Sequence, residues 1–291
     1  RMWDMIIYND LKRKGIVIPP KKDQDKSEKY AGAYVKEPKP GMYDWVVSFD
    51  LNSLYPHLIM QYNISPETLL DDRFPNVSVD RLLNEEVDLS SLEDVTVCPN
   101  GAMFTTKTRG FLPKLMEKIY SERVVFKKKM IQAKKDYEKK PTKALEKEIS
   151  RCNNIQMAKK IQLNSAYGAI GNQYFRYYML ANAEAITLGG QFSIRWIENR
   201  MNRYMNKVLK TENKDYVIAS DTDSIYLHLG PLVQVIFKDR EKNVESIVSF
   251  LDKICEVEFE KYISSSYEAL ATYVNAYDQK MFMKRETIAE R

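Results

Sequence analysis

The chain has 291 residues, of which 44% are hydrophobic and 29% are charged, and its formal net charge is +5. This length predicts roughly two compact domains with a sizeable core. The apolar runs are short and interrupted by charge, which excludes a transmembrane helix, and no secretory apolar segment stands near the N-terminus. We therefore expect a soluble, intracellular protein.

The cysteine and histidine content restricts the metal chemistry. Three cysteines, Cys98, Cys152 and Cys255, lie far apart with no paired spacing, which argues against a zinc site or a disulfide framework. The two histidines, His57 and His228, fit ordinary packing or surface roles. A metal site in this chain must then use oxygen ligands, which favours magnesium or manganese.

Charge is distributed unevenly along the chain. Residues 84–94 are acidic, whereas residues 114–160 are dense in lysine and arginine. A basic segment on a nearly neutral body suits a polyanion such as nucleic acid or a polyphosphate. A solvated helix surface would have the same composition, so this alternative stays open.

The first 29 residues predict a helix over 2–13 and a polar connector containing two adjacent prolines. A buried strand then ends at Asp50, and a helix follows, with Pro56 as its expected first residue. The N–H groups of Ser53, Leu54 and Tyr55 would lie at the positive end of this helix, where anions bind. A carboxylate beside such a turn predicts a site for a metal-bound phosphate.

The basic segment predicts two antiparallel helices, one from about Pro113 and one over 142–167, with a break near Pro141. Helical spacing puts Arg123 and Lys127 on one face of the first helix. On the second helix it aligns Lys160, Asn164 and Tyr167. Opposed faces would form a cationic cluster beside an aromatic ring, able to grip a triphosphate and cover a base. A solvated lysine surface is the alternative.

Two further helices are predicted over 181–209 and 247–262. The Gly189-Gly190 pair in the first is expected to allow close packing, because no strand precedes it as in a phosphate-binding loop. Between these helices, two apolar runs flank Asp221 and Asp223, which predicts a strand, a tight turn and a second strand. Period-two geometry would send both carboxylates to the same side, where they would attract a cation. Alternatively, the Asp-Thr-Asp sequence only forms the turn.

Three segments identify a resemblance. Residues 48–56 and 221–224 resemble the first and third palm motifs of family B DNA polymerases, and residues 160–168 resemble the second motif. Residues 30–38 and 99–113 are also similar to this family. The resemblance covers about residues 30–291 and is nearest to the polymerases of T-even-type bacteriophages.

The resemblance implies an α+β fold with a polymerase palm, an antiparallel sheet flanked by helices, and a fingers subdomain of two antiparallel helices. The palm would occupy residues 30–112 and 171–291, the fingers residues 113–170, and residues 1–29 would be an N-terminal helix and linker. The implied activity is template-directed DNA synthesis by a two-metal mechanism. Its implied catalytic residues are Asp50, Asp221, Asp223 and Lys160.

The other implied site residues hold metal and nucleotide. Two magnesium ions, replaceable by manganese, would be held by Asp50, Asp223 and the Leu51 carbonyl. One ion would activate the primer 3′-hydroxyl, and the other would neutralise charge on the leaving pyrophosphate. The incoming nucleotide would be bound by Ser53, Leu54, Tyr55, Arg123, Lys127, Lys160, Asn164 and Tyr167.

The implied partners are primer–template DNA and deoxynucleoside triphosphates, in the cytoplasm of a host cell infected by a virus. The exonuclease region and the thumb of the family are not found in this sequence. We therefore expect a truncated chain or a polymerase split into separate polypeptides. The alternative function is a nucleotide- and metal-binding subunit that is inactive until partner chains supply those parts.

The sequence departs from the family pattern in the short segment between the two fingers helices, which would reduce the fingers tip, and at two further places. Ala219-Ser220 stands where Tyr-Gly is common, and His57 stands where a small hydroxyl residue is usual. The first change is expected to alter how the hairpin tip approaches the primer end. The second is expected to change only local packing.

Overall fold

The structure, a computed structural model, describes residues 2–21, 30–238 and 243–290. Its larger sheet is antiparallel, with the strand order β1 (Val35–Lys36), β6 (Val217–Asp221), β7 (Ser224–His228), β2 (Val46–Leu51), β8 (Met283–Ala289). A smaller antiparallel sheet has the order β3 (Leu69–Arg73), β5 (Ala102–Thr105), β4 (Val95–Val97).

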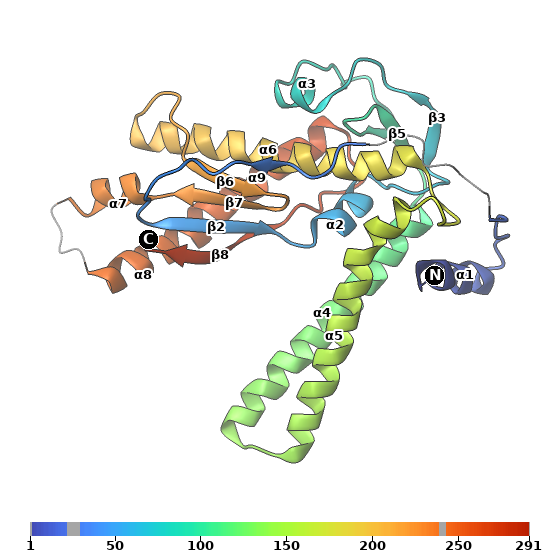
Figure 1. Cartoon of the computed structure of the whole chain (residues 1–291), viewed down its shortest axis with the longest axis horizontal. Coiled ribbons are helices and arrows are strands. Elements are labelled where there is room, and N and C mark those ends of the chain that lie inside the picture. Colours follow the sequence, from blue (N-terminus) through green and yellow to red (C-terminus); the bar gives the residue numbers. More distant parts are fainter. Residues whose placement is uncertain (1, 22–29, 239–242, 291) are drawn as a thin grey trace.

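The helices flank the two sheets (Figure 1). They are α1 (Met2–Arg13), α2 (Leu54–Gln61), α3 (Val79–Leu83), α4 (Phe111–Lys139), α5 (Lys143–Ile170), α6 (Leu180–Leu209), α7 (Gly230–Ile236), α8 (Val244–Ile254) and α9 (Glu260–Tyr273). A π-helical turn, Cys255–Phe259, joins α8 to α9. This combination confirms the predicted α+β class. No helix of the described ranges is long and apolar enough to cross a membrane.

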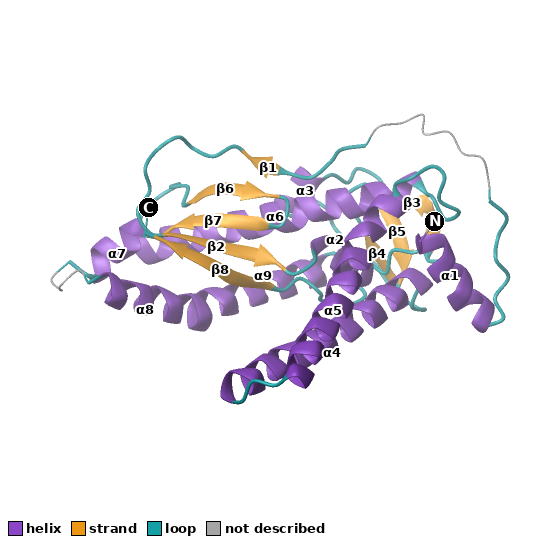
Figure 2. Ribbon diagram, turned by 60° about the horizontal axis from the view of Figure 1, so that its bottom comes forward, coloured by secondary structure: helices purple, strands orange, loops and turns teal. Residues whose placement is uncertain are grey.

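The larger sheet has one covered face and one open face. Helices α6, α8 and α9 lie on the same side of it (Figure 2). Val47, Phe49 and Leu51 of β2 are fully buried, and the Phe49 ring packs 6.4 Å from that of Phe259, between α8 and α9. Asp50, which alternates with them, points to the opposite face, where it is only half-buried. Such alternation is typical of an antiparallel sheet with one solvated face.

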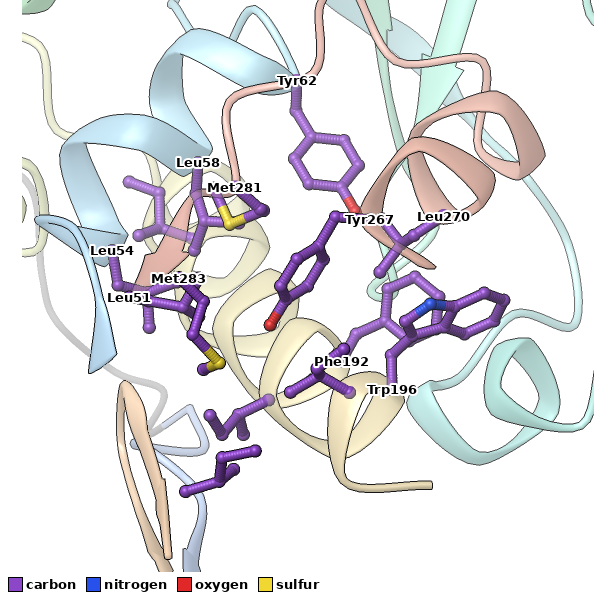
Figure 3. Close-up of a cluster of buried hydrophobic side chains, with 14 of the residues drawn as sticks. Leu51, Leu54, Leu58, Tyr62, Phe192, Trp196, Tyr267, Leu270, Met281 and Met283 are labelled. Carbon is purple, nitrogen blue, oxygen red and sulfur yellow. The ribbon is translucent and has the colours of Figure 1, made fainter. Parts of the chain in front are cut away.

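The core next to the site lies where β2, α2, α6, α9 and β8 meet. Figure 3 shows its side chains, among them Leu51, Leu54, Leu58, Tyr62, Phe192, Trp196, Tyr267, Leu270, Met281 and Met283. A Cβ on Gly190 would lie 3.4 Å from Leu54, so α6 approaches α2 closely at this glycine. The prediction that the glycine pair serves packing is therefore confirmed.

Helices α4 and α5 form the antiparallel pair that the sequence predicts, and they project from the rest of the molecule (Figures 1 and 2). The chain breaks at residues 140–142, and the Thr142 hydroxyl accepts a hydrogen bond from the Leu145 N–H, which caps α5. The predicted starts, Pro113 and Thr142, lie within two residues of the observed ones. The predicted end at Tyr167 is three residues early.

The remaining predicted helices are close to the observed ones. Helix α1 has the predicted bounds, and its Trp3 indole N–H donates to the Ser165 hydroxyl at 3.0 Å, which joins it to the base of α5. The predicted linker at 22–29 lies outside the described residues. The predicted 247–262 helix is longer, because it consists of α8, the π-helical turn and α9. The predicted subdomain division stays a prediction.

Candidate active site

The carboxylates Asp50 and Asp223 meet at the ends of neighbouring strands. Asp50 on β2 lies opposite Ser224, the first residue of β7. The Leu51 N–H then donates to the Asp223 carbonyl at 2.7 Å, which fixes the end of β2 against the hairpin turn. Residues 173 positions apart in the sequence thus share one sheet edge by strand pairing alone.

The hairpin turn between β6 and β7 differs from the expected geometry. Thr222 has a φ of 54°, in the left-handed region, and its N–H donates to the Tyr34 carbonyl at 3.0 Å. Because this residue is not extended, the period-two argument that sends Asp221 and Asp223 to the same side does not apply. Asp223 lines the cavity described below, whereas Asp221, which is exposed, does not.

A third carboxylate, Glu286 on β8, joins the site. Ser48 of β2 pairs with Thr287, but Phe49 pairs with Arg285, so Glu286 is the extra residue of a β-bulge. The sequence analysis predicts no strand over 283–289 and does not include Glu286 among the candidate site residues. The available signal was a carboxylate within a short, partly apolar run at residues 281–289.

The three carboxylates affect one another. Partial burial, together with the charges of Asp223 and Glu286, raises the pKa of Asp50 to about 6, while the charge of Lys160 opposes this shift. Burial, followed by the charges of Asp221 and Glu286, also raises the pKa of Asp223. Like charges held at close range disfavour ionisation, so the site attracts a cation that can offset them.

The turn after Asp50 carries the predicted anion-binding groups. Ser53 is the N-cap of α2 and has φ 51° and ψ 59°, a left-handed conformation that is uncommon outside glycine. Helix α2 begins at Leu54, two residues before the predicted start at Pro56. The first N–H groups of this helix have no intrahelical acceptor, and they lie at the positive end of the helix dipole.

The helix pair supplies the positive charge. Arg123 and Lys127 of α4 line the same cavity as Lys160 and Asn164 of α5. The Arg123 Nε is buried and has no hydrogen-bond partner in the described part of the protein. A buried N–H without a partner costs free energy, so an anion that accepts a hydrogen bond from this donor would be stabilised.

Together these groups line a cavity of about 590 Å³. Carboxylates lie on the sheet side, cations on the helix-pair side, and the turn before α2 between them. Such an arrangement suits an anion held by the cations and joined to the carboxylates through a metal ion. The lining residues are Asp50, Leu51, Asn52, Ser53, Leu54, Tyr55, Pro56, Arg123, Lys127, Lys160, Asn164, Thr222, Asp223 and Glu286.

Tyr167 is the other predicted site residue that does not line this cavity. Its ring lies 4.6 Å from that of Tyr55, at an interplanar angle of 38°, and its hydroxyl donates to the Tyr30 hydroxyl at 3.2 Å. Burial raises the pKa of both Tyr55 and Tyr167. Tyr167 therefore supports Tyr55, which forms part of the cavity wall.

The donor set fits a hard divalent cation. Asp50, Asp223 and Glu286 offer only oxygen ligands, as Mg²⁺ and Mn²⁺ prefer. Within the described ranges, no three acidic, histidine or cysteine side chains are already arranged as a metal site. A bound ion would complete its shell with carbonyl, water or substrate oxygens.

Comparison with known proteins identifies the family. Residues 4–266 match the family model of DNA polymerase family B. The DNA-directed DNA polymerases of Escherichia phage RB69 and Enterobacteria phage T4 are 34% and 33% identical to this chain, over 99% of its length. DNA polymerase 1 of Pyrococcus abyssi is 31% identical over 82% of this chain, and the match covers 27% of that polymerase. The chain spans 36% of the length of the two phage relatives. It belongs to family B of the DNA polymerases.

Proposed function

We propose that this chain carries the nucleotidyl-transfer site of a DNA-directed DNA polymerase, which adds deoxynucleotides to a primer 3′-hydroxyl by a two-metal mechanism. In this proposal residues 30–112 and 171–291 form the palm, and residues 113–170 form the fingers. The observation that carries it is that one cavity has carboxylates on one wall and cations on the other. This charge arrangement matches a triphosphate that is bound with metal ions.

The cations and the turn bind the nucleotide. Arg123, Lys127 and Lys160 hold the β- and γ-phosphates, and the N–H groups of Ser53 and Leu54 add donors without a change of conformation. Such preorganised donors stabilise the charge that develops on the phosphates during transfer.

The remaining cavity residues judge the shape of the nucleotide. Tyr55 stacks under the deoxyribose and would clash with a 2′-hydroxyl, and its contact with Tyr167 restrains its ring. Asn164 and Tyr167 contact the incoming nucleotide and the nascent base pair. Base identity is read by the template strand.

Two Mg²⁺ ions fit this site, and Mn²⁺ offers the same ligand preference. Asp50, Asp223 and the Leu51 carbonyl would hold them, and Asp221 would tune the site beside the primer end. When bound, such ions supply a lowered pKa for the attacking hydroxyl and neutralise charge on the leaving pyrophosphate. The raised pKa values of Asp50 and Asp223 support this assignment, because a divalent cation relieves their repulsion.

The proposed partners are primer–template DNA, deoxynucleoside triphosphates and further polymerase parts. The two phage relatives extend well beyond the region matched by this chain. We propose that exonuclease and thumb parts complete the enzyme in the cytoplasm of a host cell.

The test is extension of a primed DNA template by this chain with Mg²⁺ and deoxynucleotides. Asp223→Asn serves as the matched blank, because it removes a charge and keeps the side-chain volume. We expect extension by the parent and none by the variant, with both proteins folded by circular dichroism. Equal extension by the two would contradict the mechanism.

The same experiment separates the alternative function. Equilibrium dialysis measures binding of a deoxynucleoside triphosphate in the presence of Mg²⁺. Metal-dependent binding without extension would assign the chain as a non-autonomous subunit that needs the remaining polymerase parts. If the chain showed no binding and no extension, both the polymerase function and the alternative function would be overturned.

A further inference from the structure

Tyr120 on α4 contacts the turn that follows Asp50 without lining the cavity. Its hydroxyl accepts a hydrogen bond from the Asn52 side-chain amide at 2.8 Å. Its ring meets the edge of the His57 ring, with the centroids 4.6 Å apart and the planes at 87°. Edge-on aromatic contacts of this kind are attractive. Asn52 of the turn and His57 of α2 therefore both contact Tyr120 of the helix pair.

His57 in turn holds the strained residue of the turn. Its Nδ1 lies 3.0 Å from the Ser53 carbonyl oxygen, and its backbone N–H donates to the same oxygen at 3.2 Å. Because a carbonyl only accepts hydrogen bonds, Nδ1 must carry the proton. The His57 side chain is buried, so these bonds are shielded from water. They stabilise the left-handed conformation of Ser53, which would otherwise cost energy.

Tyr120 lies on the same face of α4 as two of the cations. Arg123 and Lys127 follow it by three and seven residues, spacings that return to one side of a helix. Tyr120, Arg123 and Lys127 therefore share the side of α4 that faces the turn and the cavity. The Asn52 backbone N–H also donates to the Phe282 carbonyl at 3.0 Å, which ties the turn to the segment that leads into β8.

We propose that Tyr120 is a positioning residue that, through Asn52 and His57, sets the distance between the phosphate-binding cations of α4 and the Ser53 turn. This role rests on the proposed function of the same cavity. It also revises the expectation that His57 changes only local packing, because the imidazole fixes both the turn and the aromatic ring of α4.

The sharpest variant is Tyr120→Phe, which removes the hydroxyl and keeps the ring against His57. We expect the apparent KM for deoxynucleotide to rise roughly 2- to 10-fold, the range that one hydrogen bond contributes, with kcat changed much less. A variant that is merely less folded would lose kcat through its active fraction and leave KM unchanged. Tyr137→Phe, the same substitution farther along α4, is the control.

A second pair of measurements tests the mechanism of the effect. In an Asn52→Ala background, Tyr120→Phe should have no further effect on KM, since the donor is already absent. Amide hydrogen exchange of residues 52–55 and 57, without nucleotide, should become faster in Tyr120→Phe and stay unchanged in Tyr137→Phe.

The outcomes distinguish this inference from the proposed function. An additive effect of the two substitutions, or unchanged exchange and KM in Tyr120→Phe, would overturn the positioning role and leave the polymerase site intact. Failure of the parent chain to bind Mg²⁺ and nucleotide would instead overturn the proposed function, and the positioning role with it.

Discussion

At the scale of single residues, the site concentrates charge that the metal-free protein must tolerate. Asp50 is half-buried next to Asp223 and Glu286, and its pKa is raised to about 6. The sequence motifs already single out Asp50 and Asp223. Glu286 was missed, because only the bulged pairing of β8 with β2 brings it to the site.

The raised pKa of Asp50 predicts a gain of stability on removal of its charge. The folded state keeps this proton to a higher pH than the unfolded state, so the free energy of unfolding falls as pH rises from about 4 to about 6. Asp50→Asn should therefore be more stable than the parent at pH 7.5 without metal, by about 1 kcal/mol after a discount for solvent screening.

Urea unfolding at pH 7.5 and pH 4 measures this difference. The gain should shrink at the lower pH, where the parent carboxyl is already protonated, and added Mg²⁺ should stabilise the parent but not the variant. The exposed Asp71→Asn is the control. If Asp50→Asn were no more stable than this control at pH 7.5, the charge of Asp50 would not destabilise the folded state.

At the scale of elements, the helix pair meets the body through a glycine. Gly110 is the N-cap of α4, and a Cβ there would lie 2.6 Å from the Ser65 Cβ and 3.2 Å from the Thr68 Cγ2. By contrast, a Cβ on Gly168, near the end of α5, would meet nothing within 4 Å. The first glycine is required by packing, and the second is not.

Alanine at these two glycines should therefore have opposite effects. Gly110→Ala should destabilise the protein by about 1 to 3 kcal/mol, because the loop at residues 65–68 must move. Gly168→Ala should stabilise it by about 0.5 to 1 kcal/mol, through the higher helix propensity of alanine. Denaturant unfolding monitored by circular dichroism compares the two, and a similar sign for both would contradict the packing at Gly110.

At the scale of the whole molecule, the number of buried side chains in the helix pair decreases with distance from the body. Near the body, Leu115, Met116 and Leu163 are buried, whereas in the outer part of the pair, residues 127–152, only Ala133 and Cys152 are buried. Elements with few buried apolar side chains open at a lower free energy than the core. The outer part thus depends mainly on contacts between the two helices.

Hydrogen exchange should reveal this gradient. We expect amides of residues 127–150 to exchange at least roughly 10-fold faster than those of β2 and β7, which corresponds to about 1.4 kcal/mol. Mass spectrometry of peptic fragments gives the rates. Equal protection of the outer helices and the central strands would contradict the prediction.

The sequence alone determined those features that depend on neighbours along the chain. Helical periodicity and Pro141 gave the antiparallel pair, and apolar runs around Asp221 and Asp223 gave the β6–β7 hairpin. The motifs around Asp50 and Lys160 carried the family resemblance, which the comparisons confirmed. Local preferences suffice for these elements, because their hydrogen bonds close within the helix or across one turn.

Tertiary structure decided the rest. The turn at the left-handed Thr222 leaves Asp223 in the cavity lining and Asp221 outside it, and the bulge in β8 adds Glu286 to the cavity. The contact of Tyr120 with Asn52 joins residues 68 positions apart. Such placements follow from long-range strand pairing and helix packing, which spacing along the chain does not specify, because each depends on where distant segments meet in the fold.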